Sequence, residues 1–287
     1  MRILVTGANG QVGQALCRLG SGHELLALDR ETLDITDADA ISRMLHEQCP
    51  QVLINAAAYT AVDRAEAEPD QAFAVNRDGP AALARACAEL AIPLFHISTD
   101  YVFDGTLAGA YREDHPASPL GVYGQSKWAG EERIRDILPR HLILRTSWVF
   151  GLEGHNFVRT MLRLGREREE LGIVDDQRGC PTFADHIAGV LLDLAARSAG
   201  DELHWGTYHY CDTPETTWYG FARAIFEAAG QRQGLVLRDL RPIATAEYPT
   251  LARRPANSVL DCQRLADHYG ITPRPWVSGL ARLVALG

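Results

Sequence analysis

The chain has 287 residues, of which 46% are hydrophobic and 23% are charged. These proportions are ordinary for a globular protein and exclude a disordered chain, and the length suits one two-lobed domain or two small ones. The formal net charge of -9 disfavours nucleic acid as a partner, because an acidic surface repels a phosphate backbone. A phosphorylated small ligand is still compatible, since backbone amides and a few arginines bind phosphate locally.

Six cysteines are spread along the chain without a Cys-x-x-Cys pair. This spacing disfavours a disulfide framework or a zinc site and favours reduced thiols in a cytosol. No apolar run has the length of a membrane span, and the apolar run at the N-terminus is too short for a signal peptide. We therefore predict a cytoplasmic protein without a membrane partner.

Short apolar runs alternate with helical patterns in the first half of the chain. Strands are expected at residues 2–6, 24–28, 51–55, 93–98 and 141–147, and helices at residues 10–19, 37–48 and 122–136. Such alternation is typical of βαβ units, which form a parallel sheet covered by helices on both faces. The predicted fold class is α/β, with a Rossmann-type doubly wound parallel sheet in a domain at residues 1–150.

The second half is less regular. Helices are expected near residues 156–166, 183–196 and 218–229, and a strand at residues 206–211. This mixture predicts a smaller mixed α/β lobe, in residues 151–287, that mainly binds substrate. The segment at about 183–211 is expected to return to the first domain.

Three glycines follow the first strand, at Gly7, Gly10 and Gly13. The first permits a tight turn, the second lets backbone approach a pyrophosphate, and the third lets the following helix pack close to the sheet. Free amides and the helix dipole then hold the phosphate charge. A plain turn would not need three glycines at this spacing, so the pattern predicts a dinucleotide site.

The second strand ends at an acid, Asp29. An acid in this position accepts hydrogen bonds from the adenosine ribose and favours NADH, because it repels a 2′-phosphate. The neighbouring Arg30 would pair with such a phosphate, so NADPH stays open as the cofactor. Asp34 suits a position facing the adenine, or a helix-capping role shared with Asp37.

Two further strand ends carry candidate site residues. The third strand runs into three alanines at residues 56–58, which let a flat cofactor lie close, although tight packing alone would also explain them. The fourth strand runs into Ser98 and Thr99. A hydroxyl there can polarise a reacting carbonyl, and we favour Thr99 over Ser98; the alternative is simple capping of the strand end.

Tyr123 and Lys127 lie four residues apart near the start of a predicted helix and therefore share a face. A nearby ammonium lowers the pKa of a phenol, which then exchanges a proton with an alcohol or ketone oxygen. Tyr-x-x-x-Lys is common by chance on surface helices. Lys127, however, is the only lysine beside 27 arginines, so a compact point charge that arginine cannot supply would explain it.

With these residues the chain resembles the extended short-chain dehydrogenases/reductases and, more narrowly, the dTDP-4-dehydrorhamnose reductase family. The resemblance covers nearly the full length. The last three of its motifs lie outside those of generic dehydrogenases. The motifs stand at residues 7–13, 55–63, 98–103, 122–124, 145–149, 176–182 and 254–258.

The resemblance implies reduction, by NADH or NADPH, of the C4 keto group of dTDP-4-dehydro-L-rhamnose, with Tyr123, Lys127 and Thr99 as catalytic residues. A nucleotide-sugar is then the substrate, which Trp148 would face with its ring and Arg254 would bind at a phosphate. The further cofactor contacts that the resemblance implies are Gln11, Val12, Asp29, Asp34, Ile35, Ala58, Tyr59 and Thr60, beside the glycines. The further substrate contacts are Asp100 and Tyr101.

One position departs from the family pattern. Some members carry a glutamate, linked to magnesium at a dimer contact, where this chain has Ala15, and the neighbouring acid of the second lobe is Asp185. We therefore predict no metal site and leave a need for Mg²⁺ open, with a monomer or a homodimer as the state of the protein.

Three rival functions share these motifs. A nucleotide-sugar epimerase would keep its NAD bound and show no net redox change. A reductase of another 4-keto-6-deoxysugar nucleotide would fit the same pocket. A non-catalytic binding subunit of the same fold is disfavoured, because the tyrosine and the lysine are both present.

Overall fold

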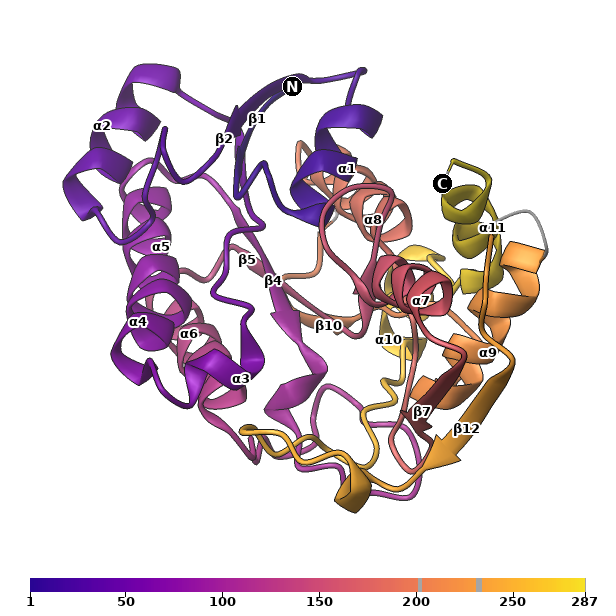
Figure 1. Cartoon of the computed structure of the whole chain (residues 1–287). Coiled ribbons are helices and arrows are strands. Elements are labelled where there is room, and N and C mark those ends of the chain that lie inside the picture. The colour runs from indigo at the N-terminus through magenta and orange to yellow at the C-terminus, as the bar shows by residue number, and fades with distance from the viewer. Residues whose placement is uncertain (201–202, 231–233, 287) are drawn as a thin grey trace.

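The computed structural model of the chain describes residues 1–200, 203–230 and 234–286. Its centre is a six-stranded parallel sheet in the order β10-β5-β4-β3-β1-β2 (Figure 1). Because β1 lies between β2 and β3, the chain winds outward from it in both directions, which confirms the predicted doubly wound Rossmann-type sheet. The strands are β1 (Arg2–Thr6), β2 (Glu24–Leu28), β3 (Val52–Asn55), β4 (Leu94–Thr99), β5 (His141–Thr146) and β10 (Gly206–His209).

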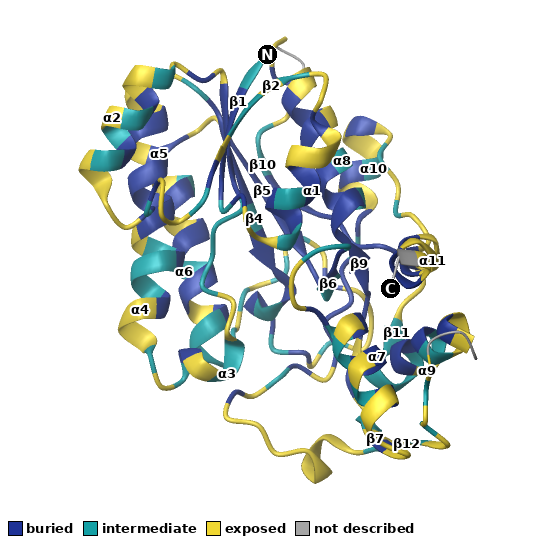
Figure 2. Ribbon diagram, turned by 45° about the horizontal axis from the view of Figure 1, so that its top comes forward, coloured by how far each residue is buried: buried dark blue, intermediate teal, exposed yellow. Residues whose placement is uncertain are grey.

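Helices cover both faces of this sheet. One face packs against α1 (Gln11–Leu19), α8 (Ala184–Arg197) and α10 (Gln263–Tyr269), with Leu16 and Leu191 in the shared core. The other packs against α2 (Ala38–Gln48), α5 (Gly79–Glu89) and α6 (Val122–Ile137), through residues such as Leu45 and Ile134. Figure 2 shows the inner strands β1, β3, β4 and β5 as almost wholly buried, whereas the edge strand β2 is only partly buried, as expected for a parallel sheet covered by helices.

The second lobe has its own apolar core, in which Val158, Phe221 and Leu280 are buried. Its helices are α7 (Phe157–Glu167), α9 (Trp218–Ala229) and α11 (Trp276–Leu286). Short strand pairs border them: β6 (Val149–Phe150) with β9 (Thr182–Phe183), β7 (Glu170–Val174) with β12 (Asp239–Ile243), and β8 (Arg178–Gly179) with β11 (Thr216–Thr217). Strand β10 and helix α8 come from the second half of the sequence but lie in the Rossmann layers.

Several elements are absent from the sequence-based expectations. They are α3 (Val62–Ala65), α4 (Pro69–Phe73), the π-helix η1 (Ala74–Asp78), the 3-10 helices η2 (Asp100–Val102) and η4 (Thr245–Glu247), the helices α5, α10 and α11, and the short strand pairs of the second lobe. Helix α5 is alanine-rich and buries most of its surface, so it lacks the apolar and polar faces that reveal a helix in a sequence. Among the described residues we find no helix with the length and apolarity that crossing a membrane requires.

Candidate active site

The three glycines form a tight junction between β1 and α1. Gly7 has a φ of +70°, and a Cβ added there would lie 2.5 Å from the backbone nitrogen of Ala57. A Cβ on Gly13 would lie 2.2 Å from the carbonyl oxygen of Gly7. Gly10 begins α1 without a side-chain hydrogen bond to the first turn, which leaves the amides of that turn to a ligand.

A cavity of about 600 Å³ opens beside this junction, at the carboxyl ends of β1, β2 and β3. The predicted cofactor residues that line it are Gly7, Gly10, Asp29, Asp34, Ile35, Ala58 and Tyr59. Gln11 and Val12 follow in the first turn of α1, whereas Thr60 is exposed and lies outside the lining. The cavity, the free amides and the three alanines fit a dinucleotide.

Asp29 lies at the rim of this cavity and accepts hydrogen bonds on both carboxylate oxygens. Thr32 donates from its amide and its hydroxyl to Oδ1, and Asn9 donates to Oδ2 at 3.0 Å. The amide and then the hydroxyl of Thr32 are the main cause of a lowered pKa for Asp29. The carboxylate is therefore ionised and held in place where a ribose would lie.

Asp34 and Asp37 have separate roles. Asp34 accepts from the amide and the hydroxyl of Thr36, and Arg30 lies 3.4 Å from its second oxygen. Asp37 is the residue that caps α2, by accepting from the amide of Ala40. Asp34 is therefore free of the capping role and faces the cavity.

The fourth strand and α6 bring a second group of predicted residues together. Thr99 ends β4 and donates to Asp100 Oδ1 at 2.9 Å, and the rings of Tyr101 and Tyr123 meet edge to face with centroids 5.8 Å apart. Asp100 is buried, and its Oδ2 has no hydrogen-bond partner. Burial raises the pKa of Asp100 to about 7, so this carboxyl is a weak acid beside the tyrosines.

Tyr123 is held as a protonated phenol. Burial, and to a smaller extent the charge of Asp100, raise its pKa to about 12, although the hydroxyl of Thr99 opposes this shift. The sequence analysis expected Lys127 to lower the pKa of Tyr123. The structure instead has a raised pKa for this phenol, so that prediction was wrong. The reason is geometric: Lys127 Nζ hydrogen-bonds the carbonyl oxygen of Ile97 at 2.7 Å and His96 Nε2 at 3.1 Å, both on β4.

His96 belongs to a buried polar chain that the sequence analysis missed. Thr6 of β1 donates to Asn55 Oδ1 at 2.7 Å, Asn55 Nδ2 lies 2.9 Å from His96 Nδ1, and His96 leads to Lys127. None of the four side chains is more than 2% exposed. Thr6 and Asn55 end the neighbouring strands β1 and β3, and His96 is the polar residue of β4 in register with Asn55; these polar residues in otherwise apolar strands were the signal that could have revealed them.

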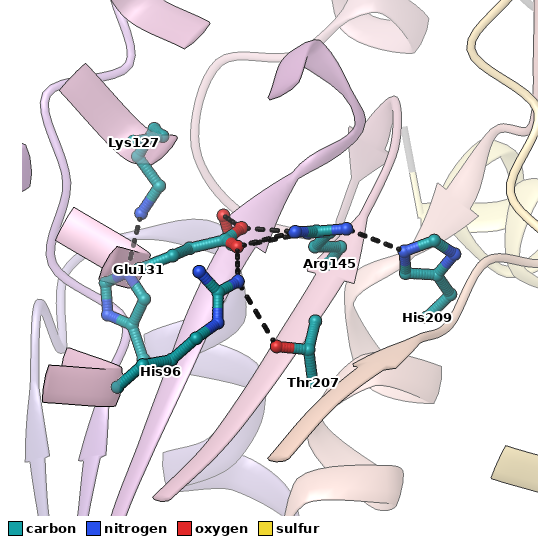
Figure 3. Close-up of polar contacts among 8 residues, drawn as sticks. His96, Lys127, Glu131, Arg145, Thr207 and His209 are labelled. Carbon is teal, nitrogen blue, oxygen red and sulfur yellow. Dashed lines mark hydrogen bonds and ion pairs between the residues drawn. The ribbon is translucent and has the colours of Figure 1, made fainter. Parts of the chain in front are cut away.

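A second buried network runs beside the first (Figure 3). Glu131 of α6 accepts from Arg145 of β5 at 2.7 Å and from Ser98 at 2.5 Å, and Arg145 also lies 3.3 Å from His209 Nε2. Although burial raises the pKa of Glu131, the charge and hydrogen bonds of Arg145 hold it below its ordinary value. The hydroxyl of Ser98, the second candidate for a catalytic hydroxyl, thus donates its hydrogen bond to Glu131.

The predicted substrate residue Trp148 stacks on Trp218 of α9, with ring centroids 3.6 Å apart and planes 7° from parallel. Its backbone has a φ of +45°. A Cβ on Gly179 would lie 2.4 Å from the indole, so only glycine fits opposite it. Trp148 is therefore a fixed part of the wall between the two lobes, and one face of its ring is covered by Trp218.

Arg254 joins the second lobe to the Rossmann half. Its guanidinium hydrogen-bonds Asp63 of α3 at 2.7 Å, and Asp63 also accepts from the amide of Ala252. Arg254, Trp218 and Phe157 all line a cavity of about 610 Å³ in the second lobe. An anionic ligand in this cavity would meet a guanidinium that is already oriented.

Asp185, the acid that the sequence analysis considered beside a possible magnesium site, is paired with two cations. Asp185 of α8 pairs with Arg18 of α1 and with Arg282 of α11, the latter at 2.9 Å. Two guanidinium groups thus balance the charge of this carboxylate. In the part of the chain that the structure describes, no three metal-ligating side chains cluster.

The arrangement matches known proteins over the whole chain. Residues 1–286 fit the family model described as the RmlD substrate binding domain. A dTDP-4-dehydrorhamnose reductase of Aggregatibacter actinomycetemcomitans is 45% identical, with 99% of this chain and 98% of that protein aligned. The chain belongs to the dTDP-4-dehydrorhamnose reductase family.

Further members of the dTDP-4-dehydrorhamnose reductase family agree with this assignment. The protein of Sinorhizobium fredii is 43% identical over 99% of this chain and 97% of its own length. The crystal structure of the Bacillus anthracis reductase in complex with NADP has a TM-score of 0.92 at 35% identity, covering 100% of this chain and 99% of that one. The similarity thus includes both lobes.

Proposed function

We propose that the chain reduces the C4 keto group of dTDP-4-dehydro-L-rhamnose with NADH or NADPH, giving dTDP-L-rhamnose. The observation that carries the proposal is the junction of two sites at one edge of the sheet. A dinucleotide cavity lies at the ends of β1 to β3, and a half-buried, protonated Tyr123 lies beside the end of β4. Family membership over residues 1–286 supports the sugar nucleotide as substrate.

The residues present fit the cofactor. Gly7 and Gly13 keep the cradle open where any Cβ would clash, and the amides that follow Gly10 suit a pyrophosphate. Asp29 suits the adenosine ribose, and Lys127 suits the nicotinamide ribose. When bound there, NADH or NADPH supplies the hydride that reduces the carbonyl carbon.

Tyr123 provides the proton for the new alcohol. A phenol with a pKa of about 12 stays protonated throughout the working range of pH, so it is ready to donate in the direction of reduction. Thr99 adds a hydroxyl that polarises the carbonyl oxygen. Lys127 is proposed to hold the nicotinamide ribose beside Tyr123 rather than to lower the pKa of the phenol, because its Nζ is bonded to Ile97 and His96.

The second lobe holds the rest of the substrate. Its cavity, lined by Phe157, Trp218 and Arg254, has aromatic surface for a base or a sugar and a guanidinium for the diphosphate. Asp100 and Tyr101 are proposed to contact the sugar near the reacting carbon.

The test is the absorbance of NADH and NADPH with enzymatically generated dTDP-4-dehydro-L-rhamnose. Rapid oxidation that requires both the sugar and Tyr123 is expected, and the faster cofactor identifies the preference. If no oxidation occurs and the purified protein carries tightly bound NAD, the nucleotide-sugar epimerase becomes the better assignment. Oxidation only with other 4-keto-6-deoxysugar nucleotides would instead change the substrate.

The remaining features of the working enzyme are also proposals. The net charge of -9 and six free cysteines support a cytoplasmic enzyme that binds no nucleic acid. A monomer or a homodimer without an essential metal is favoured, because Asp185 is satisfied by Arg18 and Arg282. Full activity after dialysis against a chelator is the expected outcome.

A further inference from the structure

Residues 244–254 form a strap that joins the second lobe to the Rossmann half and is fixed at both ends. At one end Asp176 accepts from the amide of Thr245 at 2.9 Å and from its hydroxyl at 2.5 Å. At the other end Arg254 bonds Asp63 of α3 at 2.7 Å. In Figure 1 the strap runs along the bottom of the view from β12 towards α3. These hydrogen bonds hold the two ends, so the residues between them are the part that can move.

The middle of the strap carries exposed apolar side chains. Tyr248 is 59% exposed and Leu251 is 76% exposed, and they are the two most exposed large hydrophobic side chains in the part of the chain that the structure describes. Figure 2 shows most of the strap as exposed. Single exposed apolar residues are common on protein surfaces, but two on one short tethered segment favour a surface that a bound molecule covers.

The strap borders both ends of the proposed substrate site. Tyr248, Thr250 and Arg254 line the cavity of about 610 Å³ in the second lobe. Further along the strap, Ala252 lines a small cavity that is also lined by Tyr123. A molecule that reaches from Tyr123 into the second lobe therefore passes along the strap.

Arg254 lies between these two cavities. Its guanidinium lines the cavity of the second lobe, whereas Tyr101 lines the small one. Burial is the main reason that the pKa of Tyr101 is raised, and the charge and a hydrogen bond of Arg254 oppose this shift, so the two side chains are neighbours. A diphosphate bound to Arg254 would direct the sugar towards Tyr101 and Tyr123 and the nucleobase towards Tyr248.

A nucleobase offers a flat face on which an aromatic side chain stacks. We propose that Tyr248 stacks on the nucleobase of the bound sugar nucleotide, and that the middle of the strap folds onto the substrate to bring the ring there. The fixed ends keep Arg254 in place while the middle moves. Phe157 and Trp218 line the same cavity from α7 and α9 and give the base further aromatic surface.

The first test is the equilibrium binding of dTDP to the full chain, with the dinucleotide cavity filled by NADP⁺. Tyr248→Ala should raise the Kd for dTDP by about tenfold, as expected for the loss of one stack between a base and an aromatic ring. Tyr248→Phe keeps the ring and should bind dTDP as the natural chain does. Val277→Ala, which removes an exposed apolar side chain of α11, is the control. An unchanged Kd in Tyr248→Ala would overturn the proposal.

Inorganic pyrophosphate, again with NADP⁺ bound, separates the base from the diphosphate. It has no ring, so Tyr248→Ala should leave its Kd unchanged, whereas Arg254→Ala should weaken both pyrophosphate and dTDP. If Tyr248→Ala weakened both ligands to the same extent, the ring would act through Arg254 or through the shape of the strap. The assignment of Tyr248 to the nucleobase would then be wrong.

Movement of the strap is measured by hydrogen exchange in peptides that cover residues 245–253. Binding of dTDP should slow the exchange of this segment in the natural chain and in Tyr248→Phe, because the strap then packs on the ligand. Saturation with dTDP should leave the exchange in Tyr248→Ala much less changed. Exchange that bound dTDP does not alter in the natural chain would show that the strap does not close.

This role of Tyr248 rests on the proposed sugar-nucleotide substrate, but none of these measurements needs turnover. A chain that binds dTDP through Tyr248 and does not oxidise NADH with the keto sugar would count against the proposed reduction alone. An active enzyme in which Tyr248→Ala leaves dTDP binding unchanged would count against the role of Tyr248 alone. A natural chain that fails to bind dTDP would overturn both.

Discussion

The six-stranded sheet and the second lobe bury charge in different ways. In the sheet half, Glu131 and Arg145 are 0% and 2% exposed and bond each other in the interior. In the second lobe the comparable pair on α7, Arg163 and Glu167, is 58% and 51% exposed. The Glu131–Arg145 pair is thus fixed in the interior, whereas the Arg163–Glu167 pair lies in solvent, with Arg163 at the edge of a cavity that is also lined by aromatic and apolar groups.

This difference separates the two tasks of a reductase. Proton transfer needs groups whose pKa is set by burial and by fixed partners, as for Tyr123, Lys127 and His96. Holding a sugar nucleotide needs a large cavity and a few oriented donors, as the lobe offers at Arg254. The predictions below test that division from the largest expected effect to the smallest.

Tyr123→Phe should have the largest effect on activity. Removing the phenolic proton donor should lower kcat by about 10²- to 10⁴-fold, with little change in NADH affinity. Turnover and cofactor titration measure the two quantities. Tyr219→Phe on α9 is the matched control and should behave as the natural chain; a Tyr123→Phe enzyme with near-normal kcat would remove the tyrosine from the mechanism.

Arg145→Met should have the largest effect on stability. Glu131 would keep the hydrogen bond from Ser98 but lose the buried guanidinium that balances its charge. This loss should lower the free energy of unfolding by about 3–5 kcal/mol. Arg163→Met in the second lobe removes one member of an exposed pair and should cost less than about 1 kcal/mol. Urea unfolding measures both, and equal costs would contradict the contrast between the two regions.

The sequence predicted the sheet half better than the lobe for a physical reason. The glycine loop, Asp29, and the Tyr123–Lys127 pair each lie within one turn or one strand end, so their spacing alone carries the signal. The partners of Lys127 and Arg254 come instead from other elements, and only the fold brings His96 or Asp63 to them. Asn55 belongs to the motif at residues 55–63, but the motif alone does not predict its hydrogen bonds to Ala57 and His96.

The second lobe was predicted only in outline. Helices α7 and α9 were predicted near their observed bounds, but α11 was not predicted, and the strand pairs β6–β9, β7–β12 and β8–β11 join segments far apart in the chain. The pairs that contain β6 and β8 are only two residues long, so no alternation of apolar and polar residues marks them. The stacking of Trp148 on Trp218 likewise depends on the fold, so the ring was expected to be more open to substrate than it is.

Arg254→Ala should act mainly on substrate binding. The guanidinium lines the lobe cavity and hydrogen-bonds Asp63 of the other lobe. The substitution therefore removes a partner for a substrate phosphate and a hydrogen bond between the two lobes. We expect KM for the sugar nucleotide to rise by about tenfold with a smaller change in kcat. Arg253→Ala, an exposed neighbour, is the control. A loss confined to kcat would place Arg254 at the chemical step rather than in the binding lobe.

Asp29→Ala should have the smallest effect, a change of cofactor preference by several-fold. The carboxylate is ionised because Thr32 and Asn9 bond it, and its charge opposes a 2′-phosphate where Arg30 attracts one. Without it, kcat/KM for NADPH should rise relative to NADH. Because Asp29 follows β2, which is three positions away from β4 in the sheet, kcat with saturating cofactor should barely change. An unchanged preference between NADH and NADPH would show that the adenosine ribose does not lie beside Asp29 at the end of β2. The dinucleotide would then bind in the cavity in a different orientation.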